Sequence, residues 1–298
     1  MPDNGIIMDR YAAMKVYVAV VATGSFVRAA EQLHISTTSA SRLISDLERH
    51  LGSRLLSRTT RKLAVTETGV AYYDRCRQIL SDLEEAESLA AESGARPKGL
   101  LRVSLPQSFG LRYIAPHIPE FCSLHPALEL DVGFSDRVIE FVEEGVDVAI
   151  RISVELKETL VARRLMTVPM VACAGSAYLD KFGMPKDERD LRSHNCLEYR
   201  YASIWKLMGE GPIGGNFRTD SGEMLRMAAL AGQGIAVLPI FLVDEDLRSG
   251  RLRSVMDDYP FPQLGVHAVY LESARRSARI RAFVDYFSGI FEKEAPWR

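Results

Sequence analysis

Residues 25–69 contain the pattern that most restricts how this 298-residue chain folds. A short helix is predicted to begin at Ser25, and one face of it is apolar, with Phe26, Ala29, Ala30 and Leu33. A turn at residues 34–36 leads into a second helix that ends near His50. The far side of this second helix is also apolar, with Leu43, Ile44, Leu47 and Leu51 at helical spacing. Two short amphipathic helices joined by a tight turn predict a helix-turn-helix.

The first turns of the second helix carry small hydroxyl side chains followed by a cation. Such side chains suit a recognition helix, which meets base edges and phosphates in the major groove. After Gly52, residues 54–65 form two short apolar runs around a basic turn, which predicts a two-stranded wing. The residues expected to contact DNA are Ser25, Ser36, Thr37, Thr38, Ser39, Ser41, Arg42, Arg54, Arg58, Arg61 and Lys62.

An alternative interpretation is that neither helix contacts DNA. Paired amphipathic helices occur in many folds, and a run of arginines is commonly a solvated face. The order of the elements favours DNA binding, because helix, turn, hydroxyl-rich helix and basic hairpin would present three elements to one duplex.

Many positions in this segment match a known signature: Gly24, Ser25, Phe26, Ala29, Ala30, Leu33, Ser36, Ser41, Arg42, Ile44, Leu47, Glu48, Leu51, Gly52, Leu55, Arg58, Thr66 and Gly69. This set closely resembles the amino-terminal signature of LysR-type transcriptional regulators. The sequence departs from it at Leu56, where Phe is common, and at Thr37 and Thr38, where Gln-Pro or Pro-Ser is frequent. The second departure affects which operator would be bound.

The resemblance implies a set of partners. These are double-stranded DNA, further copies of the chain in a dimer and a tetramer, RNA polymerase, and a small-molecule co-inducer of unknown identity. It implies no cofactor and no catalytic residue.

Charge is distributed unevenly along the chain, although the formal net charge is only −2. Residues 1–70 contain nine Lys or Arg against six Asp or Glu, whereas the remainder contains 28 against 33. Phosphate contacts supply much of the affinity for DNA. A local basic patch of this size is sufficient for one half-site per subunit.

Residues 69–92 contain no proline and no internal glycine. Apolar side chains recur there at alternating threes and fours: Tyr72, Cys76, Ile79, Leu83, Ala86 and Ala90. This spacing favours a long helix that dimerises through a coiled-coil seam, and the alternative is a helix packed on its own domain. Residues 93–99 then form the best candidate linker. The expected domains are a winged helix-turn-helix at 1–68, a dimerisation helix at 69–95 and an effector domain at 96–298.

The remaining chain alternates strands and helices. Strands are expected at 100–105, 128–133, 146–152, 168–174, 197–201, 205–208, 216–219, 235–238 and 265–271. Helices are expected at 8–23 before this region and at 109–124, 138–144, 177–182, 221–231 and 278–291 within it. The alternation predicts mostly parallel sheets with helices on their faces. The fold class is therefore α+β and multidomain, and its second part is a two-lobed α/β domain.

The resemblance implies that this domain is like periplasmic binding proteins. Lobe I would be residues 98–168 plus 270–298, and lobe II residues 169–269. The chain would cross between the lobes at residues 167–171 and 268–271.

Ligands in such sheets bind beyond the carboxyl ends of the strands. That rule nominates Pro106, Gln107, Ser108, Phe109, Ser135, Asp136, Arg151 and Ser153 in lobe I, and Tyr199, Tyr201, Thr219, Asp220, Ser221 and Pro239 in lobe II. The helix start near Ser108 could hold an anion, and Arg151 could bind a carboxylate. Alternatively, Ser108 caps its helix, Arg151 pairs with Glu144 or Asp147, and the two tyrosines only pack. Asp220-Ser221 stands where the family often has Asn-Asp or Asn-Asn, and the segment 205–216 is shorter than usual.

Other classes of protein fit less well. Gly232-Gln233-Gly234 follows a helix and precedes a strand, the reverse of a dinucleotide-binding order. His194-Asn195-Cys196 could suggest a nucleophile, but a helix end before a strand is the simpler interpretation. A DNA-compacting protein would not need two hundred residues of α/β structure. The four cysteines have no metal-binding spacing, and residues 1–14 do not have the pattern of a secretory signal, so a cytoplasmic protein without a metal is expected.

Overall fold

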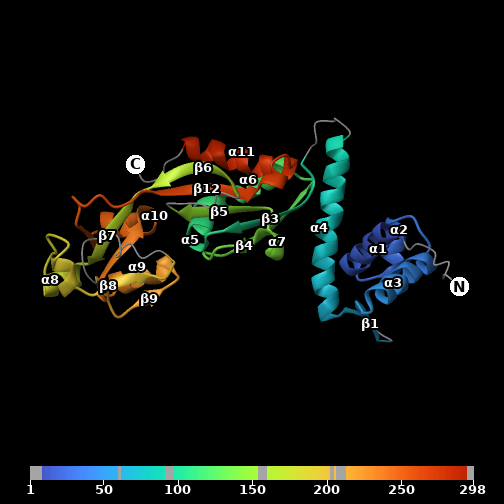
Figure 1. Cartoon of the computed structure of the whole chain (residues 1–298), viewed down its shortest axis with the longest axis horizontal. Coiled ribbons are helices and arrows are strands. Elements are labelled where there is room, and N and C mark those ends of the chain that lie inside the picture. The colour runs from blue at the N-terminus through green and yellow to red at the C-terminus, as the bar shows by residue number, and fades with distance from the viewer. Residues whose placement is uncertain are drawn as a thin grey trace. The chain divides into compact units, whose positions relative to one another are not determined.

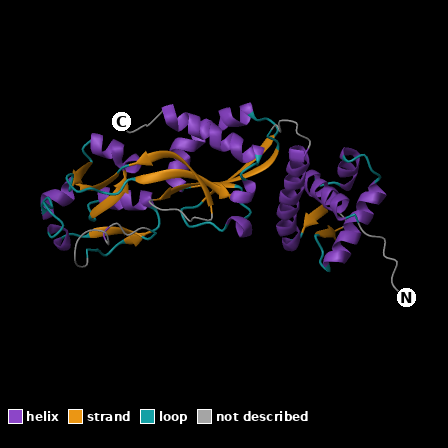
Figure 2. Ribbon diagram, turned by 45° about the horizontal axis from the view of Figure 1, so that its top comes forward, coloured by secondary structure: helices purple, strands orange, loops and turns teal. Residues whose placement is uncertain are grey.

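The computed structural model describes residues 9–59, 62–90, 97–153, 160–201, 205 and 213–293. The chain divides into two compact units, residues 1–100 and 101–298. Figures 1 and 2 show both units, the first mainly helical and the second built from sheets covered by helices. No helix in the described part of the chain is both long and apolar enough to span a membrane.

Within its described residues, the first unit contains four helices and one hairpin. In chain order these are α1 (Arg10–Thr23), α2 (Phe26–Gln32), α3 (Thr37–Leu51), β1 (Leu56–Thr59), β2 (Lys62–Val65) and α4 (Glu67–Ala90). The Asp9 carboxylate caps α1, and Gly24 ends it in the left-handed conformation at φ 63°. The predicted helix-turn-helix and wing are therefore present with boundaries shifted by one or two residues.

The core of the first unit lies where α1, α2, α3 and the wing meet. Its largest fully buried side chains are Tyr17, Ile44, Leu47, Leu55 and Leu56. Leu56 thus occupies a core position. Two side chains that were predicted to be buried are not fully buried. Leu43 is only half-buried, and Leu51 is exposed at the end of α3.

Lobe I of the second unit contains a five-stranded sheet of order β4-β3-β5-β12-β6. Its strands are β3 (Gly99–Leu105), β4 (Leu128–Phe134), β5 (Val148–Ser153), β6 (Leu160–Val168) and β12 (Leu264–Leu271). Its helical segments are α5 (Gln107–Phe109), the π-helical η1 (Gly110–Ile114), the 3₁₀ turns η2 (Ala115–His117) and η5 (Glu272–Ala274), α6 (Ile118–Leu124), α7 (Phe141–Glu144) and α11 (Ala278–Lys293). Helix α11 lies along β6 (Figure 1), and buried Phe283 and Phe287 project from it into the core.

Lobe II contains a second sheet of order β11-β7-β10-β8-β9. Its strands are β7 (Met170–Gly175), β8 (Cys196–Tyr199), β9 (Arg218–Thr219), β10 (Ile235–Pro239) and β11 (Leu252–Val255). Its helical segments are α8 (Ser176–Phe182), η3 (Asp190–Ser193), α9 (Gly222–Leu230) and α10 (Ile240–Arg248). One hydrophobic cluster contains residues of both lobes, including Leu101, Val103, Leu197 and Ala236.

The prediction of mostly parallel sheets is wrong. β3 with β5, β10 with β8, and β8 with β9 are parallel. By contrast, β12 is antiparallel to both β5 and β6, and β7 is antiparallel to both β10 and β11. The sheets are mixed because each receives strands that return from the other lobe.

One of the two predicted crossings is confirmed. The chain passes from β6 in lobe I to β7 in lobe II at Pro169, within the predicted segment 167–171. The second prediction, residues 268–271, is wrong, because β12 pairs with β5 and β6 of lobe I from Leu264 onward. The return crossing therefore lies between the end of β11 at Val255 and the start of β12.

Other differences concern element bounds. The sequence did not predict β6, α10 or β11, and the helix expected at 138–144 is confined to α7. The predicted helix at 109–124 is present but interrupted, with prolines at 116 and 119. Residues 93–96 of the predicted linker and residues 206–208 of the strand predicted at 205–208 lie outside the described residues.

Candidate nucleic-acid interface and ligand site

The turn between α2 and α3 is held by local hydrogen bonds. The Ser25 hydroxyl accepts from the Arg28 amide and caps α2. His34 takes φ 55°, the left-handed conformation that closes the turn. The Ser36 hydroxyl then accepts from the Ser39 amide at 3.0 Å and caps α3. Ser25 and Ser36 thus define where the two helices begin.

The first turns of α3 face solvent. Thr37, Thr38, Ser39 and Arg42 are exposed, Ser41 is half-buried, and the opposite face buries Ala40, Ile44 and Leu47. Thr38 and Arg42 are four residues apart and share one face of the helix. An exposed start with hydroxyl and cationic side chains, backed by a buried apolar face, is what the sequence predicted for a recognition helix.

The wing is a hairpin in which Leu56 pairs with Val65 and Thr59 pairs with Lys62. Arg54, just before it, is exposed. Arg58 and Lys62 lie within the strands, and predicted contact residue Arg61 lies outside the described residues. The backbone therefore places Arg58 and Lys62 on one short ribbon.

Glu48 was not predicted to have a structural role and was named only among the positions of the signature. One oxygen of its carboxylate accepts hydrogen bonds from the backbone amides of Leu55, at 2.8 Å, and Leu56, at 2.9 Å. This side chain of α3 thereby holds the base of the wing. A carboxylate among arginines, eight residues before a predicted strand, was the available signal.

Helix α4 begins against the same region. The Gly69 amide donates to the Thr66 hydroxyl, and the Tyr17 hydroxyl donates to the Gly69 carbonyl at 2.8 Å. Burial raises the pKa of Tyr17 above its ordinary value of 10.0, which keeps the phenol protonated as a donor. The N-terminal end of α4 is therefore anchored to α1.

The predicted seam on α4 is divided between two environments. Cys76 is fully buried in the core of its own unit, with Tyr72 packed against the same cluster, so Cys76 is unavailable to a second chain. Burial raises the pKa of the Cys76 thiol to about 11. Ile79 and Leu83, one turn apart, are 50% and 40% exposed.

In lobe I, two groups expected to bind an anion already have acceptors within the protein. The Gln107 amide donates to the Asp136 carboxylate at 3.1 Å. The Arg151 guanidinium donates to the Ser135 and Ile150 carbonyls and to the Ser104 hydroxyl at 3.1 Å. Burial lowers the pKa of Arg151 to about 10, so the side chain remains a cation at neutral pH.

The structure excludes Ser108 as the cap of its helix, whereas the Glu144 carboxylate does act on Arg151 and raises the pKa of its guanidinium, against the larger effect of burial. Ser108 lies inside α5, whose N-cap is Pro106, so its hydroxyl is not the cap. The Glu144 carboxylate pairs with Arg137 at 2.7 Å, and the Asp147 carboxylate accepts from the Arg102 amide. Phe109 is fully buried, and the Ser153 hydroxyl is buried without a hydrogen-bond partner among the described residues.

In lobe II, the nominated side chains lie at the ends of β8, β9 and β10. The rings of Tyr199 and Tyr201 pack edge to face with centroids 5.8 Å apart, while Tyr201 stays exposed. Asp220 lies 3.6 Å from Arg200. The Ser221 hydroxyl caps α9 by accepting from the Met224 amide, and the Ser221 amide donates to the buried Thr219. Pro239, at the end of β10, is the N-cap residue of α10.

Charges at the strand ends of the two lobes influence one another. Burial raises the pKa of Asp136 above its ordinary value; the Gln107 amide and Arg151 oppose this, and Asp220 of lobe II adds to it. Burial also raises the pKa of Tyr199, and Asp136 of lobe I contributes to that shift. Asp136 of lobe I therefore lies near Tyr199 and Asp220 of lobe II, in a common region between the strand ends.

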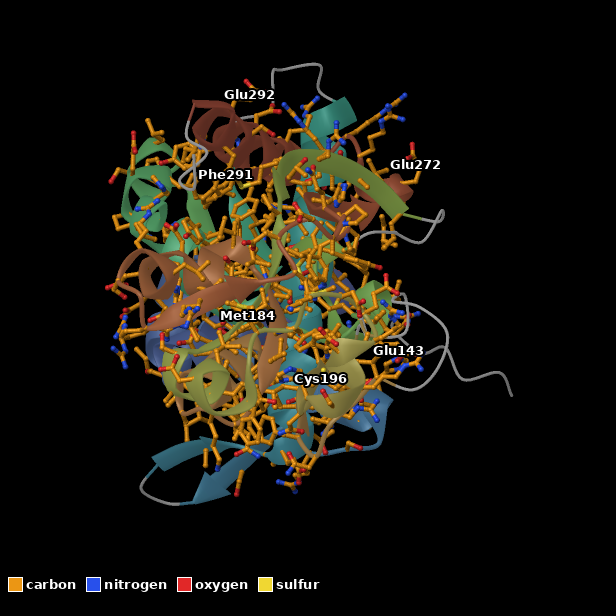
Figure 3. The ribbon with its side chains drawn as sticks, turned by 90° about the vertical axis from the view of Figure 1, so that its left-hand side faces the viewer. Glu143, Met184, Cys196, Glu272, Phe291 and Glu292 are labelled. Atoms are coloured by element: carbon orange, nitrogen blue, oxygen red, sulfur yellow. The ribbon has the colours of Figure 1, made fainter. Side chains whose placement is uncertain are left out.

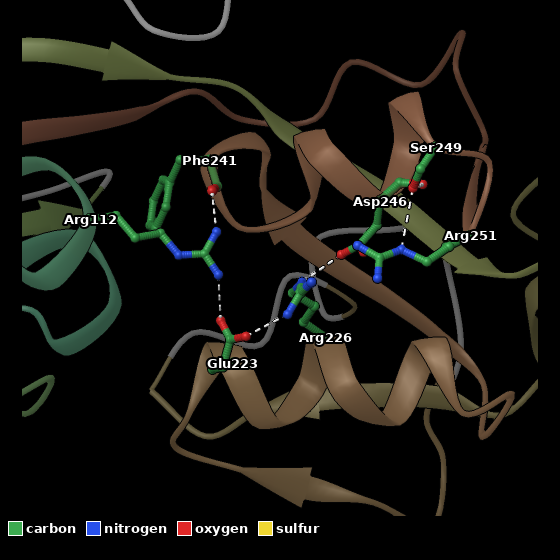
Figure 4. A network of polar contacts seen from close by, with 7 residues as sticks. All are labelled: Arg112, Glu223, Arg226, Phe241, Asp246, Ser249 and Arg251. Carbon is green, nitrogen blue, oxygen red and sulfur yellow. Dashed lines mark hydrogen bonds and ion pairs between the residues drawn. The ribbon is translucent and has the colours of Figure 1, made fainter.

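A chain of ion pairs also joins the lobes (Figure 4). Arg112 of η1 donates to the Phe241 carbonyl and pairs with Glu223 of α9, which pairs with Arg226. Arg226 and Arg251 both pair with Asp246, which is fully buried.

A hollow of about 1000 Å³ elsewhere in lobe II is lined by residues 184–189 and 254–260 and includes none of the nominated residues. Met184, labelled in Figure 3, is 42% exposed there. Because the hollow is open and lies away from the ends of β8 and β10, we base the candidate ligand site on the strand ends.

The segment His194-Asn195-Cys196 is structural. The Tyr178 hydroxyl lies 3.2 Å from Nδ1 of buried His194, and the Asn195 amide group donates to the Asn216 side chain and the Gln233 carbonyl. Burial raises the pKa of the Cys196 thiol to about 12, which disfavours a thiolate nucleophile. Across the described ranges, no group of three or more His, Cys, Asp or Glu side chains could hold a metal ion.

Comparison with known families gives two matches that together cover most of the chain. Residues 11–70 match the bacterial regulatory helix-turn-helix protein, lysR family, and residues 94–290 match the LysR substrate binding domain.

Individual proteins are similar over nearly their whole length. An HTH-type transcriptional regulator of Haemophilus influenzae is 38% identical over 271 residues, covering 88% of this chain and 94% of the relative. An HTH-type transcriptional repressor of Pseudomonas aeruginosa is 34% identical, covering 95% and 93%. The solved structure of CrgA, a LysR-type transcriptional regulator from Neisseria meningitidis, is 32% identical with a TM-score of 0.58, covering 94% and 98%.

Proposed function

We propose that this chain, which belongs to the LysR family of bacterial regulators, binds a dyad-symmetric DNA operator as a homo-oligomer and responds to a small molecule held between its two lobes. The chain is a LysR-type DNA-binding transcriptional regulator with an effector-binding domain, and it is not an enzyme. The proposal adds the form of the operator, the assembly and the place of the ligand.

The exposed start of α3 carries the proposal. Thr37, Thr38, Ser39 and Arg42 face solvent, whereas Ile44 and Leu47 anchor the same helix in the core. We assign these exposed side chains, with Arg54, Arg58, Arg61 and Lys62 of the wing region, as the DNA contacts. Ser25 and Ser36 would contribute mainly by fixing the helix starts, since both act as caps.

Exposed apolar side chains on α4 support the homo-oligomer. Ile79 and Leu83 lie one turn apart and would be covered by the same helix of a second copy. Two linked recognition helices would match an operator with two half-sites about one helical turn apart. Pairing of effector domains would extend the dimer to a tetramer. RNA polymerase as a partner and a cytoplasmic location complete the proposal.

The common region between the strand ends supports the ligand site. Asp136, Arg151 and Ser153 would line it from lobe I, and Tyr199, Tyr201 and Asp220 from lobe II. A ligand there would contact both lobes and so favour one relative placement of them. That change would alter how the paired DNA-binding units meet the operator.

The experiment is footprinting of the purified full chain on the DNA beside its own coding region. It is repeated with a panel of small acids and aromatic compounds. Two protected half-sites with dyad symmetry, whose protection changes with one compound, are expected. A single unpaired half-site would contradict the dyad, and a footprint that no compound alters would contradict the response.

A further inference from the structure

Glu48 joins α3 to the base of the wing through hydrogen bonds. One of its carboxylate oxygens accepts from two successive backbone amides, those of Leu55 and Leu56. Bonds to a charged acceptor are among the stronger hydrogen bonds in proteins. Two of them at one oxygen define both the position and the direction of the chain where the wing begins.

The other strand of the wing ends at the same place. Thr66 follows β2 directly, and its amide donates to the Leu55 carbonyl at 3.0 Å. The Thr66 hydroxyl also donates to the Arg54 carbonyl at 2.7 Å. Both ends of the hairpin are therefore tied to the short segment that Glu48 holds.

A small rotation at this base would move the wing tip considerably. β1 has four residues, so the tip lies roughly 13 Å from the base at about 3.3 Å per residue. A rotation of about 10° would displace the tip by roughly 2 Å, which is enough to break a hydrogen bond to a phosphate.

We propose that Glu48 is a positioning residue of the DNA interface, which sets the wing at the distance from the recognition helix that lets both contact one duplex. The proposal rests on the proposed function, because it requires the wing to bind DNA.

Simple electrostatics predicts the opposite effect for this residue. Glu48 is an anion among Arg42, Arg49, Arg54 and Arg58, so removing its charge should strengthen binding to phosphates. A positioning role predicts that losing the acceptor weakens binding even though a repulsive charge disappears. The sign of the change therefore separates the two roles.

Three variants of the full chain separate charge from hydrogen bonding. Glu48→Gln removes the charge but keeps an oxygen acceptor of the same reach, so its DNA affinity should stay within about twofold of the parent or rise. Glu48→Ala removes both, and Glu48→Asp keeps the charge on a shorter side chain. Each of these two should lose about tenfold in affinity, a change of about 1.4 kcal/mol.

Asp46 supplies the matched control. It is a carboxylate on the same helix, and among the described residues it pairs with Arg49 at 2.8 Å. Asp46→Ala removes the same charge, so its affinity should be unchanged or higher. A loss as large as that of Glu48→Ala would overturn the positioning role.

The measurement is fluorescence anisotropy of a labelled duplex from the DNA beside the coding region, over a range of salt concentrations. Circular dichroism melting identifies the temperature at which every variant is folded. In the parent background, Arg58→Ala should make the slope of log affinity against log salt shallower by about one unit. In the Glu48→Ala or Glu48→Asp background, the further change should be close to zero, because the wing is already displaced.

Two failures are distinguishable. If Arg58→Ala leaves the slope unchanged in the parent, the wing does not bind phosphates, and the wing part of the proposed function falls together with this inference. If Arg58→Ala acts in the parent and acts equally in both Glu48 backgrounds, the wing binds DNA but Glu48 does not position it.

Discussion

The guanidinium of Arg112 in lobe I lies 3.0 Å from the carboxylate of Glu223 in lobe II. Both side chains are partly exposed, so this ion pair by itself contributes about 0–1 kcal/mol. The next residues of this network are increasingly buried. Arg226 is partly buried, and Asp246 is fully buried. The surface contact between the lobes is thereby continuous with a buried cluster that also holds α9 against α10.

Asp246 should be the most sensitive member of this cluster. Asp246→Ala would leave the partly buried Arg226 without its buried partner, and breaking such a pair costs about 3–5 kcal/mol. Asp244→Ala is the control, because Asp244 pairs with Arg248 on the surface of the same helix and should cost less than about 1 kcal/mol. Urea unfolding followed by circular dichroism measures the unfolding free energy of both variants. Equal losses of unfolding free energy would show that the buried pair contributes no more to stability than the surface pair.

Arg42→Ala should weaken operator binding by about tenfold while dimerisation is kept. Arg42 is exposed on the recognition helix, and one contact to a base or phosphate is worth about 1–3 kcal/mol. Arg253→Ala in lobe II removes one exposed cation outside the DNA-binding unit and should have no effect. Anisotropy with the footprinted duplex checks affinity, and sedimentation checks assembly. Unchanged affinity would exclude Arg42 from the interface.

Replacing Ile79 and Leu83 together with Glu should dissociate the proposed dimer. The substitutions would remove the two exposed apolar side chains that we propose are covered by the second copy. They would also place like charges opposite one another in the coiled-coil seam, which destabilises it. Val142→Glu in lobe I is a control, since Val142 is 71% exposed on a separate element. Sedimentation equilibrium gives the mass of each variant. A doubly substituted chain that remains dimeric would place the dimer contact elsewhere.

Gly69→Ala and Gly289→Ala should change stability in opposite directions. A methyl group at position 69 would lie 2.2 Å from the Leu55 carbonyl oxygen, whereas nothing lies within 4 Å of one at position 289. The first should cost about 1–3 kcal/mol by overpacking, and the second should gain up to about 1 kcal/mol from helix propensity in α11. Thermal melting of both variants measures the difference. Stabilisation by Gly69→Ala would contradict the close approach of α4 to the wing.

Acidification should destabilise lobe II through His194. Burial lowers the pKa of this imidazole below its ordinary value of 6.5, so the folded chain favours the neutral form. The folded state therefore binds a proton less readily than the unfolded state, and this stability is present above pH 6.5 and lost as pH falls through the folded pKa. His194→Gln should flatten the dependence of unfolding free energy on pH in this range. Burial also lowers the pKa of His267, so the part of the pH dependence that comes from His267 should remain in this variant.

The sequence alone predicted the order of domains and most of the surface that we propose contacts DNA. Helix starts and ends depend on neighbours in the chain, so Ser25, Ser36 and Gly52 could be located from local pattern. The exposed face of α3 followed from the spacing of Ile44 and Leu47.

Only the tertiary structure decided which distant segments meet. Glu48 hydrogen-bonds to the base of the wing, and β12 pairs within the sheet of lobe I. The Asp136 carboxylate accepts a hydrogen bond from the Gln107 amide, at the helix start that was expected to bind an anionic ligand. Hydrogen bonds and strand pairings between segments far apart in the chain depend on the packing of the whole core. Such contacts produce no periodic pattern in the sequence of either segment. The sequence therefore indicated where DNA and ligand would bind, while the packing decided which side chains hold those surfaces in place.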